Sequence, residues 1–540
     1  MSGLMLDPPA VLAFPLTGMQ LIEASAGTGK TYTIANLYLR HIVEGRDVAG
    51  VLVVTFTVAA TDELRGRIRA RLFETLALLE HEADTDDSFL AGLSVRLREQ
   101  GLAEQTVRRL RLAVRAMDEA AIYTIHGFCQ RVLSEFAFNS GQQFRLEVLA
   151  DDVDLWRRAI QDWWRRTGYP LNAVQARLFR DSLGDLEKFE ALIKPLLGVQ
   201  HKRLLPEVES WDRLLTRWDA LAVELDALAV RWREDAASLS QIVRESKGLS
   251  RAQTSPYHEN WLIPSLAVLD DYFAQEQREP PPDDFEVLTA QCMARFALKK
   301  ADPALDDDFF LRCDGVWETF CTLKRDLRTA ALAEAAAFAR EQVRQAKFTA
   351  QVLSYDDLLA EMYRALHGGN GAALADEVRR RFPVAMIDEF QDTDPVQYGI
   401  FRELYRDCPD CGLIMIGDPK QAIYSFRGGD IFTYMQARED VGAARIYTLG
   451  INWRSTPQVL NAVNAVFEQR AVNAFVYGET IPYTAMRASA KPHRHLERSG
   501  ERSAALQLWL LPEGRDAKGG AKTLSKEAAA GLSHAAVAQE

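Results

Sequence analysis

A glycine-rich segment at residues 21–31 constrains the fold of this 540-residue chain more than any other stretch. The apolar pair Leu21-Ile22 leads into EASAGTGKT, and residues 32–41 have helical character. This order predicts a strand, a tight turn and a helix, with backbone N–H groups and the helix N-terminus facing an anion. The segment matches G-x-x-x-x-G-K-[ST] except at its first position, which is Ala24.

The sequence therefore predicts a bound nucleoside triphosphate. A lysine at the end of such a turn reaches the β- and γ-phosphates, and the hydroxyl that follows it ligates Mg²⁺. Lys30 and Thr31 stand at these two positions. The residues expected to hold the triphosphate are Ala24, Ser25, Ala26, Gly27, Thr28, Gly29, Lys30 and Thr31.

A second segment, FPVAMIDEFQD at residues 382–392, predicts the other half of a phosphate-loop site. An apolar strand that ends in two carboxylates can place one on Mg²⁺ and the other beside the attacking water. Asp388 is the expected metal ligand and Glu389 the expected base. The pair could be ordinary surface charge, but the upstream lysine loop favours the catalytic interpretation.

Further apolar runs at 51–57, 121–125 and 413–418 predict additional buried strands. In open α/β sheets, ligands bind beyond the carboxyl ends of the strands, which makes residues 55–57 candidates for contact. His126 follows one strand, and taken alone it favours a structural role. After the last strand, Gln421 precedes Tyr424 and Phe426, a weak pattern for stacking on a nucleic-acid base.

The composition shifts between residues 140 and 334, where strand-like runs disappear and eight of the ten tryptophans lie. Helical spacing predicts a helical insertion, divided by three prolines at 280–282. Tryptophans at this spacing favour a hydrophobic core over a base-stacking platform. Arginines at 65, 67, 69 and 71 favour a solvated helix face over a DNA contact.

Composition indicates an ordinary globular protein of roughly three or four domains, with 48% hydrophobic and 26% charged residues. No apolar run approaches the ~18 residues of a membrane span, and no signal pattern begins the chain. We expect a cytoplasmic protein with no membrane partner. The net charge of −12 neither indicates nor excludes nucleic acid, and Cys408 and Cys411 favour a turn over a metal or redox site.

Six motifs in a fixed order resemble the superfamily 1 DNA helicases of the UvrD/Rep type, and within them the RecB family, the beta subunits of exodeoxyribonuclease V. The motifs span residues 21–455, which makes the set far more specific than any single one. They are residues 23–31, VVTFTVAATDELR (53–65), AMDEAAIYTIHGFCQ (116–130), FPVAMIDEFQDTDPVQ (382–397), IGDPKQAIYSFRGGDIFTY (416–434) and NWRS (452–455).

The resemblance implies an ATP-dependent DNA helicase that moves 3′ to 5′, requires ATP and Mg²⁺, and acts at double-strand breaks with RecC-like and RecD-like subunits. It implies that Gln421 senses the γ-phosphate, that Arg454 contacts it, and that Trp453 lies near the base or ribose. The residues implied to line a single-strand track are Thr55, Phe56, Thr124, His126, Tyr424 and Phe426.

The expected fold is an α/β RecA-like motor domain with a large all-helical insertion. Residues 1–139 and 335–445 form the first motor domain, 140–334 form the insertion, and 446–540 begin a second, incomplete motor domain. Later helicase motifs and a nuclease domain are absent before residue 540. We therefore expect an N-terminal fragment that binds nucleotide weakly and does not unwind duplex DNA alone. A free-standing UvrD-like or AddA-like helicase and a non-catalytic DNA-binding scaffold are the alternatives.

Overall fold

The computed structural model divides into two compact units, residues 1–144 with 357–540 and residues 145–356. Within them the structure describes residues 4–81, 84–136, 147–149, 151–197, 205–276, 279–299, 302–423, 429–475, 477–490, 497–498, 501–502, 504–506, 510–511, 514–515 and 521–539.

The first unit is built on a seven-stranded parallel sheet in the order β1-β9-β2-β8-β7-β3-β4. Its central strands are apolar and buried, as expected for a parallel sheet covered on both faces. This confirms the predicted α/β fold class. The strands are β1 (Leu4–Met5), β2 (Gly18–Ala24), β3 (Val51–Thr55), β4 (Ile122–Thr124), β7 (Val384–Ile387), β8 (Gly412–Gly417) and β9 (Ile446–Leu449).

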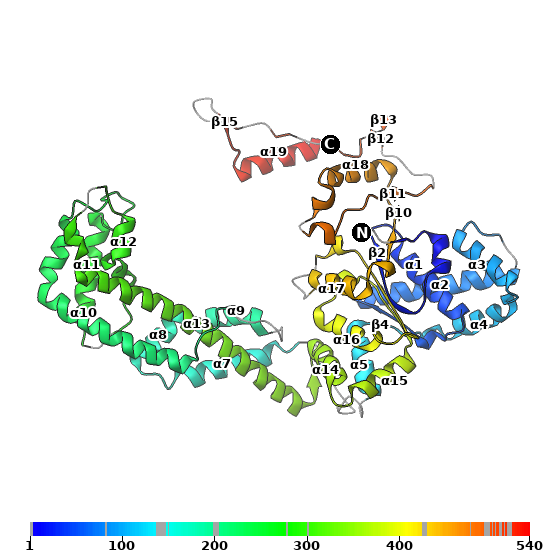
Figure 1. The fold of residues 1–540 in the computed structure, drawn as a ribbon, viewed down its shortest axis with the longest axis horizontal. Helices are drawn as coiled ribbons and strands as arrows, with labels where there is room; N and C mark the ends of the chain where they lie inside the picture. Colours follow the sequence, from blue (N-terminus) through cyan, green and yellow to red (C-terminus); the bar gives the residue numbers. More distant parts are fainter. Residues whose placement is uncertain are drawn as a thin grey trace. The chain divides into compact units, whose positions relative to one another are not determined.

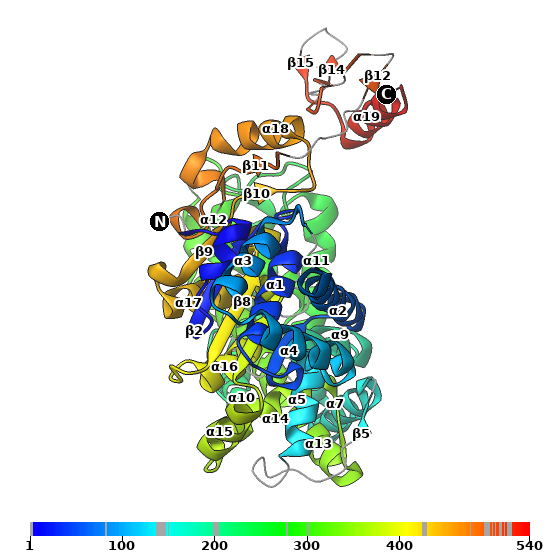
Figure 2. The ribbon, with the colours of Figure 1, turned by 90° about the vertical axis from the view of Figure 1, so that its right-hand side faces the viewer.

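Helices cover both faces of this sheet, with α1 and α2 on one side and α16 and α17 on the other (Figures 1 and 2). Apolar side chains of α1 and α2 join those of β2 and β3 in one buried core. The helices of this unit are α1 (Lys30–Val43), α2 (Val58–His81), α3 (Ser88–Glu99), α4 (Ala103–Arg115), α5 (Ile125–Glu135), α15 (Gly371–Arg381), α16 (Pro395–Tyr405), α17 (Ile431–Val441), α18 (Pro457–Glu468) and α19 (Lys526–Gln539).

The strand β9 corrects the predicted boundary at residue 446. It begins there, yet it pairs with β2 and β1 and so completes the first sheet. The next strand, β10 (Ile451–Asn452), instead pairs in parallel with β11 (Arg487–Ala488). Sequence pattern alone could not separate these two short strands, because only one residue lies between them.

The second unit is helical, and its longest element is α13 (Asp308–Ala350), with 43 residues (Figure 1). Because α13 runs unbroken through residue 334, the unit extends beyond the predicted end of the insertion. The other helices are α7 (Val153–Gly168), α8 (Ala173–Leu183), α9 (Leu186–Leu197), α10 (Trp211–Glu245), α11 (Glu259–Ala274) and α12 (Ala290–Arg295), and α14 (Tyr355–His367) spans the division between units.

The tryptophans of this unit form its core, as predicted, with one exception. Trp163, Trp211, Trp218 and Trp232 are buried, and Trp232 donates to the Asp270 carboxylate at 2.8 Å. Trp261 on α11 is instead 62% exposed.

Two chain segments meet at one end of the helical unit. β5 (Glu147–Val148) pairs in parallel with β6 (Val352–Leu353), which comes just after α13. Lys347, buried near the end of α13, forms an ion pair with Asp152 and donates to the Ser354 hydroxyl at 2.9 Å. The two segments that bound the helices are thereby held side by side.

The arginines of α2 correct a prediction, because two of them are not solvated. The Arg65 guanidinium donates to the carbonyl oxygens of Met117, Ala120 and Ile122. Arg71 is buried and donates to Asn36 at 2.6 Å and, in an ion pair, to Asp87 at 2.8 Å. Arg67 and Arg69 do form exposed ion pairs.

The Cys408–Cys411 segment forms the predicted turn before β8, with a backbone hydrogen bond from Cys411 to Cys408 of 3.3 Å. The structure also joins the two sulfurs in a disulfide, which the sequence did not lead us to expect. Among the described helices, none combines the length and the apolar character needed to cross a membrane.

Candidate functional site

The glycine-rich turn lies between β2 and α1 as predicted. Gly27 and Gly29 have φ angles of +78° and +92°, a region that only glycine adopts readily. The Thr28 hydroxyl donates to the Ser25 carbonyl at 2.7 Å and closes the turn. Lys30 is the first residue of α1, so the positive end of the helix dipole faces the turn. This is a ready-made anion site.

The two predicted phosphate-site motifs meet at the carboxyl end of the sheet. The Lys30 ammonium lies 2.6 Å from the Glu389 carboxylate, although 359 residues separate them. Glu389 itself has a φ of +51°, a strained conformation for a residue with a side chain. Its backbone N–H donates to the Asp388 carboxylate at 2.9 Å.

Asp388 lies directly beyond the end of β7, where its own N–H donates to the Val54 carbonyl at 3.0 Å. Burial, with the neighbouring Glu389 charge, raises the pKa of Asp388 to about 6, and Lys30 partly opposes this shift. A carboxylate whose charge is this poorly compensated would be stabilised by a divalent cation. Asp388, with the half-buried Thr31, fits an Mg²⁺ site.

Gln421 lies beyond the end of the neighbouring strand, β8. Its side-chain amide donates to the Asp418 carboxylate at 2.8 Å, and Lys420 pairs with the same carboxylate at 2.8 Å. The structure thus places Gln421 at the same edge of the sheet as Lys30 and Glu389, because β8 lies between β2 and β7.

The segment after β10 is bonded directly to the glycine-rich turn. The Trp453 N–H donates to the Gly27 carbonyl at 2.8 Å, and the Asn452 amide donates to the Ala26 carbonyl at 2.8 Å. A Cβ at Gly27 would lie 2.8 Å from the Arg454 Cβ. Trp453 and Arg454 are therefore against the turn, with both side chains exposed.

Three contributors to this geometry escaped the sequence analysis: Asn452, Asp418 and Gln391. Asn452 comes just before two predicted residues, Asp418 lies three residues before Gln421, and Gln391 lies two residues after Glu389. Their positions within the motifs were the only signal, since a buried amide or carboxylate has no distinctive spacing.

The residues implied to contact single-stranded DNA fall into three groups. Thr55 and Thr124 are register partners at the ends of β3 and β4. Thr55 is 1% exposed and its hydroxyl bonds to Thr57 and Thr61, so its side chain stabilises the start of α2. The Thr124 hydroxyl caps α5 by accepting from Gly127. Phe56 is exposed and His126 half-buried, and Tyr424 and Phe426 lie outside the described residues.

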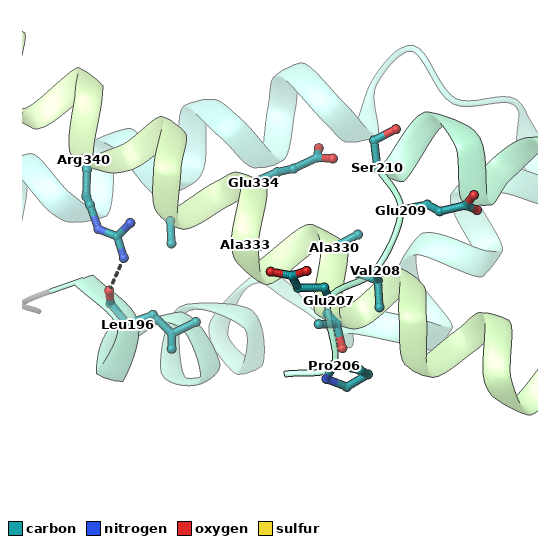
Figure 3. A pocket seen from close by; sticks show the side chains of 12 residues that line it. Leu196, Pro206, Glu207, Val208, Glu209, Ser210, Ala330, Ala333, Glu334 and Arg340 are labelled. Atoms are coloured by element: carbon teal, nitrogen blue, oxygen red, sulfur yellow. Dashed lines mark hydrogen bonds between the residues drawn. The ribbon is translucent and has the colours of Figure 1, made fainter. Parts of the chain in front are cut away.

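A separate hollow of about 550 Å³ lies in the helical unit, where residues 206–210 approach α13 (Figure 3). The Arg340 guanidinium at one end donates to the Leu196 carbonyl at 2.8 Å. Three glutamates, Glu207, Glu209 and Glu334, give the remaining lining an acidic character. None of the predicted site residues is part of it.

Comparison with known protein families decides the family. The UvrD/REP helicase N-terminal domain matches residues 9–442. The chain belongs to this helicase family. Five of the six motifs that carry the resemblance lie within the matched residues, and NWRS at 452–455 lies beyond them.

Curated relatives of this UvrD/REP helicase chain narrow the resemblance further. The RecBCD enzyme subunit RecB of Escherichia coli K12 is 37% identical over 525 residues, which cover 94% of this chain and 42% of the relative. The same subunit of Haemophilus influenzae is 33% identical and covers 92% and 44%, and that of Chlamydia trachomatis is 29% identical and covers 84% and 43%. These matches confirm the predicted similarity to RecB. The chain spans less than half the length of these relatives.

Proposed function

We propose that the first unit is the ATP-binding motor of a RecB-like DNA helicase subunit. The observation that carries this proposal is the 2.6 Å contact between Lys30 and Glu389. It joins the end of the glycine-rich turn to the carboxylate pair that follows β7. Membership of the UvrD/REP family supports ATP as the nucleotide and DNA as the track.

The proposed mechanism begins with the exchange of one anion for another at Lys30. A triphosphate in the turn competes with Glu389 for the ammonium, so binding releases the carboxylate from its ion pair. Glu389 is then free to orient a water molecule and accept its proton. Thr31 and Asp388 would hold Mg²⁺, which neutralises charge that develops on the transferring phosphoryl group.

Gln421, Trp453 and Arg454 complete the proposed site. Gln421 senses the γ-phosphate from the end of β8, Arg454 contacts it, and Trp453 lies beside the base or ribose. Because Trp453 donates to Gly27 and Asn452 to Ala26, a shift of the turn would pass directly to the segment with Arg454. Through this connection, nucleotide binding would move the segment that contains Arg454.

The output we propose is 3′-to-5′ movement along single-stranded DNA, with Phe56 and His126 on the track and with Tyr424 and Phe426 as further contacts. The relatives' names describe them as subunits of the RecBCD enzyme. We propose RecC-like and RecD-like partners for this chain and a role at double-strand breaks in recombinational repair.

Mg²⁺-dependent binding and single-turnover hydrolysis of radiolabelled ATP, with protein in excess and with and without single-stranded DNA, test the proposal. We expect weak binding and slow hydrolysis that DNA accelerates, and we expect Lys30→Ala to abolish both. Arg67→Ala is the matched control, because it also removes a cation from this unit but from an exposed ion pair. If the chain binds DNA and that binding responds neither to nucleotide nor to Lys30→Ala, the chain is a DNA-binding scaffold and not a motor.

A further inference from the structure

A buried glutamine connects the ends of β7 and β8. Gln391 is only 3% exposed and lies in the short turn that follows Glu389. Its side-chain oxygen accepts from the Asp418 N–H at 2.9 Å. Its side-chain nitrogen donates to the Glu389 carboxylate at 2.8 Å and lies 3.2 Å from the Asp392 carboxylate. All the hydrogen-bonding atoms of this amide therefore have partners.

The partners of Gln391 also fix the orientation of its amide. If oxygen and nitrogen exchanged places, an N–H group would face the N–H of Asp418 and an oxygen would face two carboxylates. Both contacts would be repulsive. Gln391 must therefore direct its donor toward Glu389.

Gly417 shows how closely the two segments approach. A Cβ at this position would lie 2.6 Å from the Gln391 side-chain oxygen and 3.0 Å from its backbone nitrogen. Contacts that short leave no room for a Cβ unless the Gln391 side chain or the backbone of this turn shifts. The end of β8 and the turn after β7 are thus in close contact.

The hydrogen bonds continue from Asp418 to the predicted phosphate sensor. The Asp418 carboxylate accepts from the Gln421 amide at 2.8 Å, while the N–H of the same residue is bonded to Gln391. A continuous path runs from Gln421 through Asp418 and Gln391 to Glu389.

We propose that Gln391 is a positioning residue that couples the phosphate sensor Gln421 to the base Glu389 through Asp418. The inference rests on the proposed function of this site. Gln391 and Lys30 contact the same oxygen, Oε2, of Glu389. When a triphosphate draws Lys30 away, Gln391 keeps its hold on Oε2, so Oε1 is left to face the water.

The coupling also gives Gln421 a way to act on the base. When its amide turns toward a γ-phosphate, the bond to Asp418 is lost, and the Asp418 carboxylate, still paired with Lys420, shifts to a new position. The 2.9 Å bond between Asp418 and Gln391 transmits that shift to the amide that holds Glu389. ADP lacks the γ-phosphate and leaves the path in its resting state.

The test is a double-mutant cycle with Gln391→Leu, Gln421→Ala and both together, read by single-turnover ATP hydrolysis. Each single change should lower the rate constant about 10- to 100-fold, the effect of one hydrogen bond to a charged group. The effects of residues that act as a unit do not add, so the rate constant of the double variant should be no more than about threefold below that of the slower single variant. A multiplicative loss would overturn the coupling.

Gln20→Leu is the matched control. Gln20 is also a buried glutamine of this unit, 1% exposed in β2, and its amide donates to the Thr17 carbonyl at 3.0 Å. We expect its rate constant to stay within about twofold of wild type. Urea unfolding of every variant identifies those that fail to fold.

Nucleotide affinity supplies a readout that needs no turnover. Gln391→Leu should leave the affinity for ADP within about twofold and reduce the preference for ATPγS over ADP as Gln421→Ala does. An unchanged preference would refute the path between the two residues. If wild type itself binds neither ADP nor ATPγS, the proposed function is refuted, and the inference fails with it.

The variant Gln391→Glu distinguishes a positioning role of Gln391 from a purely structural one. It also replaces Gln391→Leu in the test if the leucine variant does not fold. A glutamate has the same size and donates only when protonated. Hydrolysis by this variant, relative to wild type at the same pH, should therefore rise as the pH falls. A ratio that is constant between pH 8 and pH 5.5 would reduce Gln391 to a structural residue.

Discussion

Replacement of Asn452 by alanine tests whether the segment that contains Arg454 is bonded to the nucleotide turn. Asn452 makes three hydrogen bonds: its amide donates to Ala26 at 2.8 Å, and its oxygen accepts from the N–H groups of Arg454 at 3.0 Å and Ser455 at 2.8 Å. Alanine removes all three while the backbone bond from Trp453 to Gly27 stays.

The expected loss follows from the number of bonds and their surroundings. Each net hydrogen bond contributes about 1 kcal/mol, so three give about 3 kcal/mol. Arg454 is exposed, and water can replace the partner of its N–H, which lowers the expected loss to about 2 kcal/mol. If the turn loosens by the same amount, the affinity for a fluorescent ATP analogue falls about 30-fold.

Asn464→Ala provides the control for this change. Asn464 on α18 also makes three hydrogen bonds, to Met486 twice and to the Tyr483 hydroxyl. Its removal should lower the free energy of unfolding by a similar amount in urea titrations and leave nucleotide affinity within about twofold. Equal nucleotide affinities of the two variants would refute the direct connection between Asn452 and the turn.

Three further changes test other features. Burial lowers the pKa of His41 from 6.5 to about 3, so its contribution to stability is complete above pH 6.5 and falls as the pH drops. Between pH 7.5 and pH 5, the free energy of unfolding of wild type, measured in urea titrations, should fall by about 2 kcal/mol. His41→Leu should not show this loss. Gly417→Ala should lower the free energy of unfolding in urea titrations by about 1–3 kcal/mol, because its new Cβ would contact Gln391. Gly66→Ala, in open space on α2, should raise it by about 0.5–1 kcal/mol. An unchanged stability of Gly417→Ala would contradict the close approach of the two segments. Trp232→Ala should lower the free energy of unfolding by about 3–5 kcal/mol because Trp232 is buried, whereas exposed Trp261→Ala should lower it by less than about 0.5 kcal/mol. Equal melting temperatures of the two variants would contradict the assigned core.

The motifs predicted the sheet and its carboxyl edge because each combines an apolar strand with the polar residues that follow it. Lys30, Asp388 and Gln421 were found in this way, and the parallel order of strands brings their elements to one edge. Gln391 was not found, because nothing in the sequence says that its amide spans from β7 to β8. That contact depends on how closely the strand ends approach, a tertiary property.

The same reason explains the errors at β9 and at the arginines of α2. The sequence does not show which strand residues 446–449 join, and so the predicted boundary falls at residue 446. Likewise Arg65 has the spacing of a surface residue, yet the carbonyl oxygens of Met117, Ala120 and Ile122 lie within reach of its guanidinium. Helical periodicity describes one helix, whereas burial depends on its neighbours.

The parallel pair of β5 and β6 makes the helical unit a module with adjoining ends. Neighbouring strands lie about 4.8 Å apart, so the chain leaves this unit almost where it entered, after some 200 residues. A unit with such ends can be removed, and because the two strands are parallel, residue 148 would be joined to residue 352 by a crossover linker of about a dozen residues. With a crossover of that length the β5–β6 pair can stay intact, so the helices can be removed as one block.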